Sequence, residues 1–138
     1  MDGRPVVIDT NCLVQMISKH SPYRKIWDAF LGKRFVLCVS NEILEEYQEI
    51  IEHLTTPEIA ENVVLLLINQ SNVKFVDPHF RTGLIKADPD DDKFVDCAFA
   101  AGADIIVSED SHFKVLNHTS FPYIHVLTMD EFINLYKL

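Results

Sequence analysis

Three acidic residues of this chain fall where one predicted element gives way to the next: Asp9, Asp91 and Asp110. A fourth, Glu46, lies about two turns into a predicted helix. If such like charges meet in a cleft, they repel one another strongly unless something neutralises them. A hard divalent cation is the simplest neutraliser, since Mg²⁺ and Mn²⁺ prefer carboxylate and water oxygens, and the His and Cys spacings of zinc sites are absent. Carboxylate-held metals activate water for phosphodiester hydrolysis. The acids therefore predict a metal-dependent hydrolase.

Short apolar runs alternate with helical patterns along the whole chain. The first run, residues 5–8, is rich in β-branched residues and has no polar alternation, as in a strand buried on both faces of a parallel sheet. Strands are predicted over residues 5–8, 35–39, 73–76, 105–108 and 123–127, and helices over 11–18, 23–30, 41–51, 56–67, 92–101 and 128–138. This order predicts an α/β, three-layer domain with a mostly parallel, roughly five-stranded sheet flanked by helices.

That architecture predicts where the acids lie. In parallel sheets the carboxyl ends of the strands and the N-termini of the following helices open into one crevice. Asp9 and Asp110 follow predicted strands, while Asp91 opens a helix and Glu46 lies about two turns into another. We therefore expect the four acids to meet at one edge, with no lysine or arginine to neutralise them.

Each acid also has a purely structural interpretation. Asp9 could cap the helix that follows it, and Asp91 belongs to a segment, 88–92, in which Asp before a helix is usually a cap or a dipole partner. Glu46 could lie on a solvated helix face, and Asp110 could be a turn residue before Ser111.

Composition limits the class of protein. At 138 residues and 48% hydrophobic content, the chain is expected to form one domain over residues 1–138. With 21 acidic and 12 basic residues, it lacks the charge for a broad phosphate-binding face. Three cysteines without C-x-x-C spacing are expected in the core, and no apolar run is long enough for a membrane span, so a cytoplasmic location is expected.

Four segments together resemble PIN domains in identity, order and spacing: VVIDTNCLV, SNEILEEY, DPDDDKFVDCAFAAGAD and IIVSEDSHF. The resemblance covers nearly the whole chain and is greatest to the bacterial VapC-like toxin components of toxin–antitoxin systems. It implies a Rossmann-like sheet, dependence on Mg²⁺ or Mn²⁺, and endoribonuclease cleavage of RNA by an activated water. It also implies a cognate antitoxin protein that inserts a peptide across the crevice, and a homodimer in some members.

The resemblance assigns the metal and catalytic positions residue by residue. Asp9 is similar to the acid that ends the family's first strand, and Glu46 to the family glutamate that precedes a large apolar residue. Asp91 matches the third acid because it places Phe94 on the expected helix face, although Asp92 takes that place in a shifted alignment. Asp110 matches the fourth.

Supporting roles follow from the same resemblance. Asn11 and Ser108 would orient ligands or phosphate oxygens, while Glu109 departs from the family's T-G-D pattern. Asp96 would hold a water near the metal or be exposed to solvent. Six basic residues could steer RNA: Arg24, Lys25, Lys33, Arg34, Lys93 and Lys114.

Three alternatives stay open. An aspartate-based phosphatase needs a second acid where this chain has Asn11, and a receiver domain needs a lysine after the last strand, where Thr128 follows. A non-catalytic PIN-fold interaction protein is the third.

Overall fold

Five parallel strands form the centre of the computed structural model, which describes residues 3–79, 81–86, 88–118 and 123–138. Their order is β3-β2-β1-β4-β5, and all neighbouring strands pair in parallel. The strands are β1 (Pro5–Ile8), β2 (Val36–Val39), β3 (Val73–Phe75), β4 (Ile105–Val107) and β5 (His125–Leu127). The chain builds outward from β1 to β3 and then returns to the other side of β1 at β4. The strand order therefore reverses between β1 and β4, which is where α/β folds place ligands.

The predicted strands are confirmed, and their burial explains the sequence pattern. The central strands β1, β2 and β4 are almost wholly buried, because helices cover both faces of the sheet. The edge strand β5 begins at His125, two residues later than predicted, where pairing with Ile105 of β4 begins.

Helix boundaries follow the predicted capping residues. The helices are α1 (Thr10–Ile17), α2 (Arg24–Leu31), α3 (Asn41–Leu54), α4 (Pro57–Asn69), α5 (Asp92–Ala101) and α6 (Met129–Tyr136), with 3₁₀ turns at η1 (Pro89–Asp91) and η2 (Ser111–His118). Ser40, Thr56 and Thr128 each accept a hydrogen bond from the third residue beyond them, and Thr128 forms a full capping box. Gly102 ends α5 at φ 68°, a left-handed conformation that glycine adopts without strain. The sequence pattern had not indicated η2.

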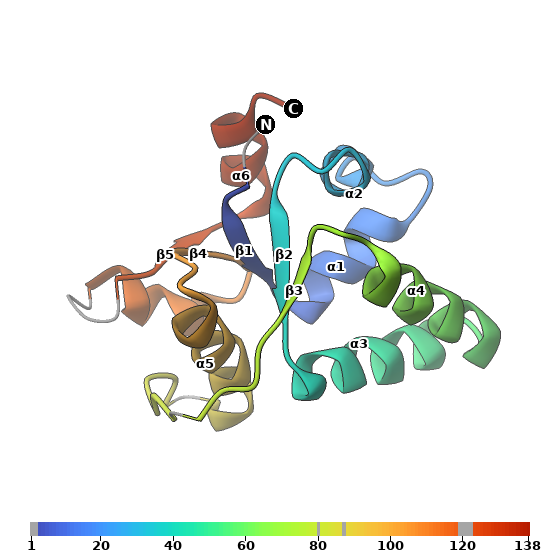
Figure 1. Cartoon of the computed structure of the whole chain (residues 1–138). Helices are drawn as coiled ribbons and strands as arrows, with labels where there is room; N and C mark the ends of the chain where they lie inside the picture. The colour runs from blue at the N-terminus through green and yellow to red at the C-terminus, as the bar shows by residue number, and fades with distance from the viewer. Residues whose placement is uncertain (1–2, 80, 87, 119–122) are drawn as a thin grey trace.

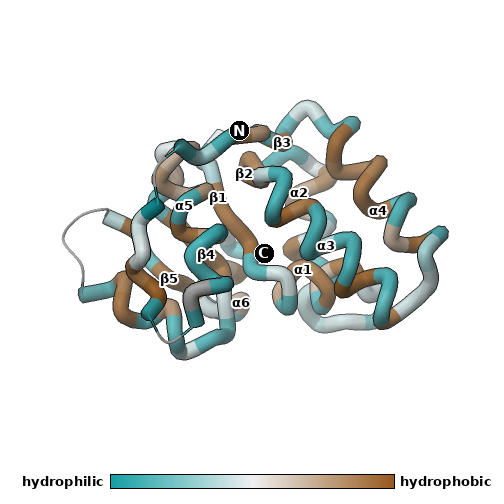
Figure 2. The backbone as a smooth tube through the Cα atoms, turned by 90° about the horizontal axis from the view of Figure 1, so that it is seen from below, coloured by the Kyte–Doolittle hydropathy of each residue, from teal (hydrophilic) through white to brown (hydrophobic). Residues whose placement is uncertain are grey.

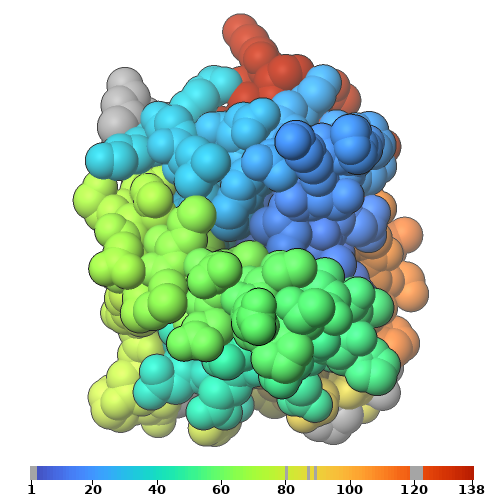
Figure 3. All heavy atoms as spheres, turned by 90° about the vertical axis from the view of Figure 1, so that its right-hand side faces the viewer, coloured from blue at the N-terminus to red at the C-terminus, as the bar shows by residue number. Residues whose placement is uncertain are grey.

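The helices complete a three-layer α/β domain (Figure 1). Helix α5 packs on one face of the sheet against β1, β2 and β4, while α1, α2 and α6 lie on the other side (Figure 2). Helices α3 and α4 run side by side beyond β2 and β3. Helix α4 covers much of the face seen in Figure 3 and exposes Ile59, Leu65 and Ile68.

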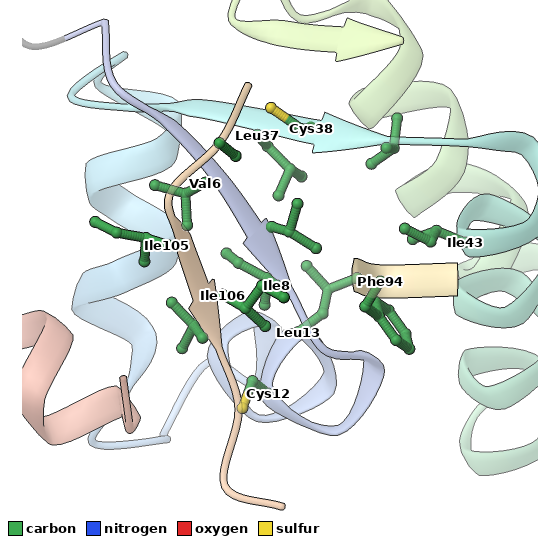
Figure 4. Packing of buried hydrophobic residues seen from close by; sticks show 14 of the residues in the cluster. Val6, Ile8, Cys12, Leu13, Leu37, Cys38, Ile43, Phe94, Ile105 and Ile106 are labelled. Atoms are coloured by element: carbon green, nitrogen blue, oxygen red, sulfur yellow. The ribbon is translucent and has the colours of Figure 1, made fainter. Parts of the chain in front are cut away.

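The core lies between the sheet and the helices on both faces. Side chains of β1 and β4 meet Leu13 of α1 and Phe94 of α5 near the carboxyl ends of the strands (Figure 4). Trp27 and Phe30 are buried in the core, with their rings 5.3 Å apart. The three cysteines are free and buried, as predicted. In the part of the chain that the structure describes, no helix is long and apolar enough to cross a membrane.

Candidate active site

Asp9 occupies the end of β1, beside β4. Ile8 pairs with Val107, and the Asp9 amide donates to the Val107 carbonyl at 3.0 Å. This register brings the Ser108 hydroxyl to the Asp9 carboxylate, to which it donates at 2.9 Å. Asp9 holds the N-cap position of α1, yet its side chain makes no capping hydrogen bond. The carboxylate is only 7% exposed. Asp9 is therefore a buried acid that does not cap its helix.

The surroundings of Asp9 disfavour its ionised form. Burial raises the pKa of Asp9, and hydrogen bonds from Ser108 and from the Thr10 backbone oppose that rise. The negative charges of Glu46 and Asp110 raise the pKa of Asp9 further. Both acids are close enough to act on Asp9, so a cation placed among the three would lower the energy of all of them.

Asp91 is the second acid with no structural task. It holds the N-cap position of α5 without a side-chain capping bond, and its Oδ2 atom is buried and accepts no hydrogen bond. Burial raises the pKa of Asp91 to about 6, and the charges of Asp88, Asp9 and Asp110 raise it too, against the lowering effect of Lys93. An orphaned carboxylate oxygen of this kind fits a cation better than it fits the surrounding protein.

Glu46 does not lie on a solvated helix face. One carboxylate oxygen accepts from the Thr10 hydroxyl, and the other lies 2.7 Å from the Lys93 ammonium, with both side chains of this pair largely buried. The expectation that no lysine neutralises the site is therefore wrong. Lys93 stands in the first turn of α5, which packs against α3, so the two helices bring the pair together. This contact also engages Lys93, one of the residues predicted to steer RNA.

Asp110 is both a turn residue and a member of the site. Its carboxylate accepts a hydrogen bond from the His112 amide at 2.9 Å, at the start of η2. Its own amide donates to the Ser108 hydroxyl at 3.0 Å. Ser108 thus accepts from Asp110 and donates to Asp9, which fixes the direction of its O–H bond. One buried hydroxyl therefore orients the acid after β1 relative to the turn after β4.

A shallow pocket opens beside these acids and is lined by Asp9, Asn11, Val14, Gln15, Glu109 and Asp110. Asn11 is exposed there, on the first turn of α1. Glu109 also lines it, but its Oε2 atom accepts from the Met129 amide at 2.7 Å. That bond engages Glu109 at the N-terminus of α6, where the helix dipole favours a negative charge.

Asp92 and Asp96 hold the segment that precedes α5. The Asp92 carboxylate accepts from the Ile85 amide at 2.7 Å. Asp96 accepts from the amide and hydroxyl of Thr82 at 2.8 and 2.9 Å, and Arg81 lies 3.4 Å away. The solvent-exposed interpretation of Asp96 is wrong, because its side chain is 2% exposed. The geometry also disfavours Asp92 as the third acid, since its carboxylate is engaged outside the site.

A group of ligand atoms suited to a metal includes two residues that the sequence had not singled out as ligands. Among the residues that the structure describes, a carboxylate oxygen from each of Asp88 and Asp91 and a ring nitrogen of His112 lie within 4.8 Å of one another. Asp88 was visible in the acidic run 88–92, and His112 in the turn after Asp110. Neither residue had a pattern of its own that would identify it as a ligand.

The sheet topology excludes one alternative. Receiver domains have the strand order 2-1-3-4-5, whereas this sheet has the order 3-2-1-4-5.

Comparison with known proteins agrees with this fold. No curated protein matches the chain in sequence. A chain of the DNA-bound VapBC complex from Salmonella typhimurium is similar in structure, with a TM-score of 0.62, 22% identity, and coverage of 91% of this chain and 98% of that one. A chain of VapBC2 from Rickettsia felis, bound to a DNA fragment from the promoter, has a TM-score of 0.61 and 19% identity. The match covers 90% of this chain and 98% of that one. The PIN domain endonuclease Utp24 has a TM-score of 0.52 and 18% identity, and the match covers 90% of this chain and 84% of that one.

At these identities the solved structures show a shared fold and no more. The sequence comparison goes further, because the model of the PIN domain family matches residues 5–112, which is most of the chain and a range that contains the acidic positions described above. This chain belongs to the PIN domain family.

Proposed function

We propose that this PIN domain is an endoribonuclease that hydrolyses RNA phosphodiester bonds and depends on Mg²⁺ or Mn²⁺. The observation that carries the proposal is the Asp9 carboxylate, which is buried at the strand-order reversal, caps no helix, and lies within the field of Glu46 and Asp110. Burying a carboxylate costs free energy, so such an acid is a candidate for function and not for stability.

The donor set fits a hard divalent cation. Asp9 and Asp91 would bind it directly, because their carboxylates serve no capping role and the Asp91 Oδ2 atom has no partner. Asp110 would complete the shell. When bound, the cation would activate a water and neutralise charge at the scissile phosphate.

Neighbouring residues would hold this arrangement in place. Ser108 fixes the orientation of the Asp9 carboxylate. Glu46 is held by Thr10 and Lys93, so it would accept hydrogen bonds from water near the cation while its charge stays partly compensated. Asn11 lines the open side of the pocket, where it could contact a phosphate oxygen. Such supporting contacts set the orientation of metal ligands.

We further propose that the chain is the toxin component of a toxin–antitoxin pair, with a cognate antitoxin protein as partner. The similarity to the VapBC complexes from Salmonella typhimurium and Rickettsia felis supports this assignment. Light scattering of the purified chain, alone and with the product of a neighbouring gene, would test both the partner and the expected homodimer. A single domain over residues 1–138 and a cytoplasmic location stay predictions.

Cleavage of a labelled RNA with and without Mg²⁺ or Mn²⁺ tests the nuclease assignment. Asp9→Asn keeps the shape and removes one charge, so we expect it to lose at least about 100-fold in rate while staying folded. The matched control is Asp104→Asn, which removes an exposed charge before β4, at the opposite end of that strand, where the acid pairs with Arg4. Equal cleavage by wild type and Asp9→Asn would refute the proposal. Antitoxin binding without cleavage under any metal would favour a non-catalytic interaction module.

A further inference from the structure

His112 lies at the rim of the acidic site, on the first turn of η2. Its Nδ1 atom is 3.4 Å from the Asp110 Oδ1 atom and 3.9 Å from the Asp91 Oδ2 atom. Both separations exceed the roughly 2.7–2.9 Å of a charge-assisted hydrogen bond. The imidazole therefore faces two carboxylates without closing onto either.

These separations match those between ligands of one ion. Bonds of about 2.0–2.3 Å from a divalent cation to nitrogen and oxygen place neighbouring ligand atoms roughly 3 to 4.5 Å apart. Atoms of Asp88, Asp91 and His112 all lie within 4.8 Å of one another. The Asp91 Oδ2 atom is buried and accepts no hydrogen bond, so a cation here would supply the partner that the protein does not.

The nitrogen donor determines which cation fits. Transition-metal ions accept an imidazole ligand more readily than Mg²⁺, which takes oxygen ligands almost exclusively. An imidazole added to the carboxylates of this site therefore makes it discriminate between ions that carboxylates alone accept nearly equally.

We propose that His112 is a metal ligand that, with Asp88 and Asp91, makes this site prefer a transition-metal ion such as Mn²⁺ to Mg²⁺. The proposal deepens the proposed function, on which it rests for the presence of a divalent cation at the acidic site. The side chain of His112 is 42% exposed, so replacing it leaves the core intact.

Mn²⁺ binding tests this assignment without any measurement of activity. Free Mn²⁺ is followed by electron paramagnetic resonance during titration, and pulsed resonance of the loaded protein detects a ¹⁴N nucleus bonded to the ion. We expect directly bonded nitrogen in wild type and none in His112→Ala or His112→Gln. We also expect about 10-fold weaker Mn²⁺ binding in both variants and a much smaller change in Mg²⁺ affinity measured by competition. The matched control is His118→Ala, an exposed histidine at the other end of η2 that belongs to no such ligand group among the residues that the structure describes.

Wild-type protein that binds no Mn²⁺, or binds it without a nitrogen signal, would overturn the proposal, as would a signal that survives both His112 variants. These outcomes are separate from the nuclease assay. A nitrogen signal that depends on His112 in a protein without RNA cleavage would support the metal ligand and contradict the proposed function. Cleavage without the nitrogen signal would do the reverse.

Discussion

Replacing Asp91 with Asn should stabilise the metal-free protein at neutral and alkaline pH. The pKa of Asp91 rises from its ordinary 3.8 to about 6 in the folded chain, first because the carboxyl is buried and then because Asp88, Asp9 and Asp110 surround it. Between about pH 4 and pH 6 the folded state therefore binds more protons than the unfolded state, so the free energy of unfolding falls as pH rises through this window. Above this pH window the Asp91 carboxylate is charged in the folded state, and the folded protein is destabilised by the full free-energy cost of burying that charge.

The magnitude follows from the shift. A rise of about 2 units at 1.36 kcal/mol each gives an upper limit near 3 kcal/mol. The Asp91 side chain is 17% exposed, and solvent screening reduces this limit to about 1–2 kcal/mol. Asp91→Asn removes the charge and keeps the shape, so it should add about 1–2 kcal/mol at pH 8, and almost nothing at pH 4, where the carboxyl is protonated. The midpoint of thermal unfolding should rise by about 3–8 °C at the higher pH.

Thermal and urea unfolding with a chelator present, from about pH 4 to pH 8, would measure this difference. Asp90→Asn is the matched control, because it removes the same charge one residue earlier, where the side chain is exposed. Mn²⁺ should then stabilise wild type more than Asp91→Asn, since binding to the folded state alone adds to its stability. A variant that is less stable than wild type at pH 8, or a gain that does not depend on pH, would refute the reasoning.

Three further substitutions test the contacts around the acids. Ser108→Ala removes the donor to the Asp9 carboxylate at 2.9 Å, so the pKa of Asp9 should rise further. The acidic limb of the cleavage profile should therefore move to higher pH, and an unmoved profile contradicts this role. Tyr47→Phe removes the hydroxyl that donates to the Ile8 carbonyl at 2.5 Å. Because this buried carbonyl loses its side-chain donor, the free energy of unfolding measured in urea should fall by about 1–3 kcal/mol. Lys93→Met frees Glu46 from its ion pair and should tighten Mn²⁺ binding by about 3–10-fold in the titration; weaker binding would show that the lysine positions the glutamate instead.

The sequence alone determined the strands, the α-helices and the edge at which the acids lie. A cap such as Thr128 or an end such as Gly102 depends on residues within one or two helical turns, so local chemistry identifies it. The apolar run 5–8 has no polar alternation, a pattern typical of central strands of parallel sheets, and β1 is buried as that pattern predicts. Since Asp9 follows this run directly, its place at the carboxyl edge required no tertiary information.

Only the tertiary structure decided how the side chains at that edge are used. The contact between Ser108 and Asp9 depends on the register of β1 with β4, which no local pattern specifies. The different surroundings of Asp91 and Asp92 depend on which carboxylate the preceding segment engages, and adjacent residues at a helix start point in different directions.

The pairing of Lys93 with Glu46 likewise depends on the packing of α5 against α3, two helices far apart in the sequence. Sequence periodicity gives the buried face of each helix and leaves open which partner residues meet across it. The location of the acids near one edge of the sheet was therefore predictable, while their individual partners depended on the assembled fold.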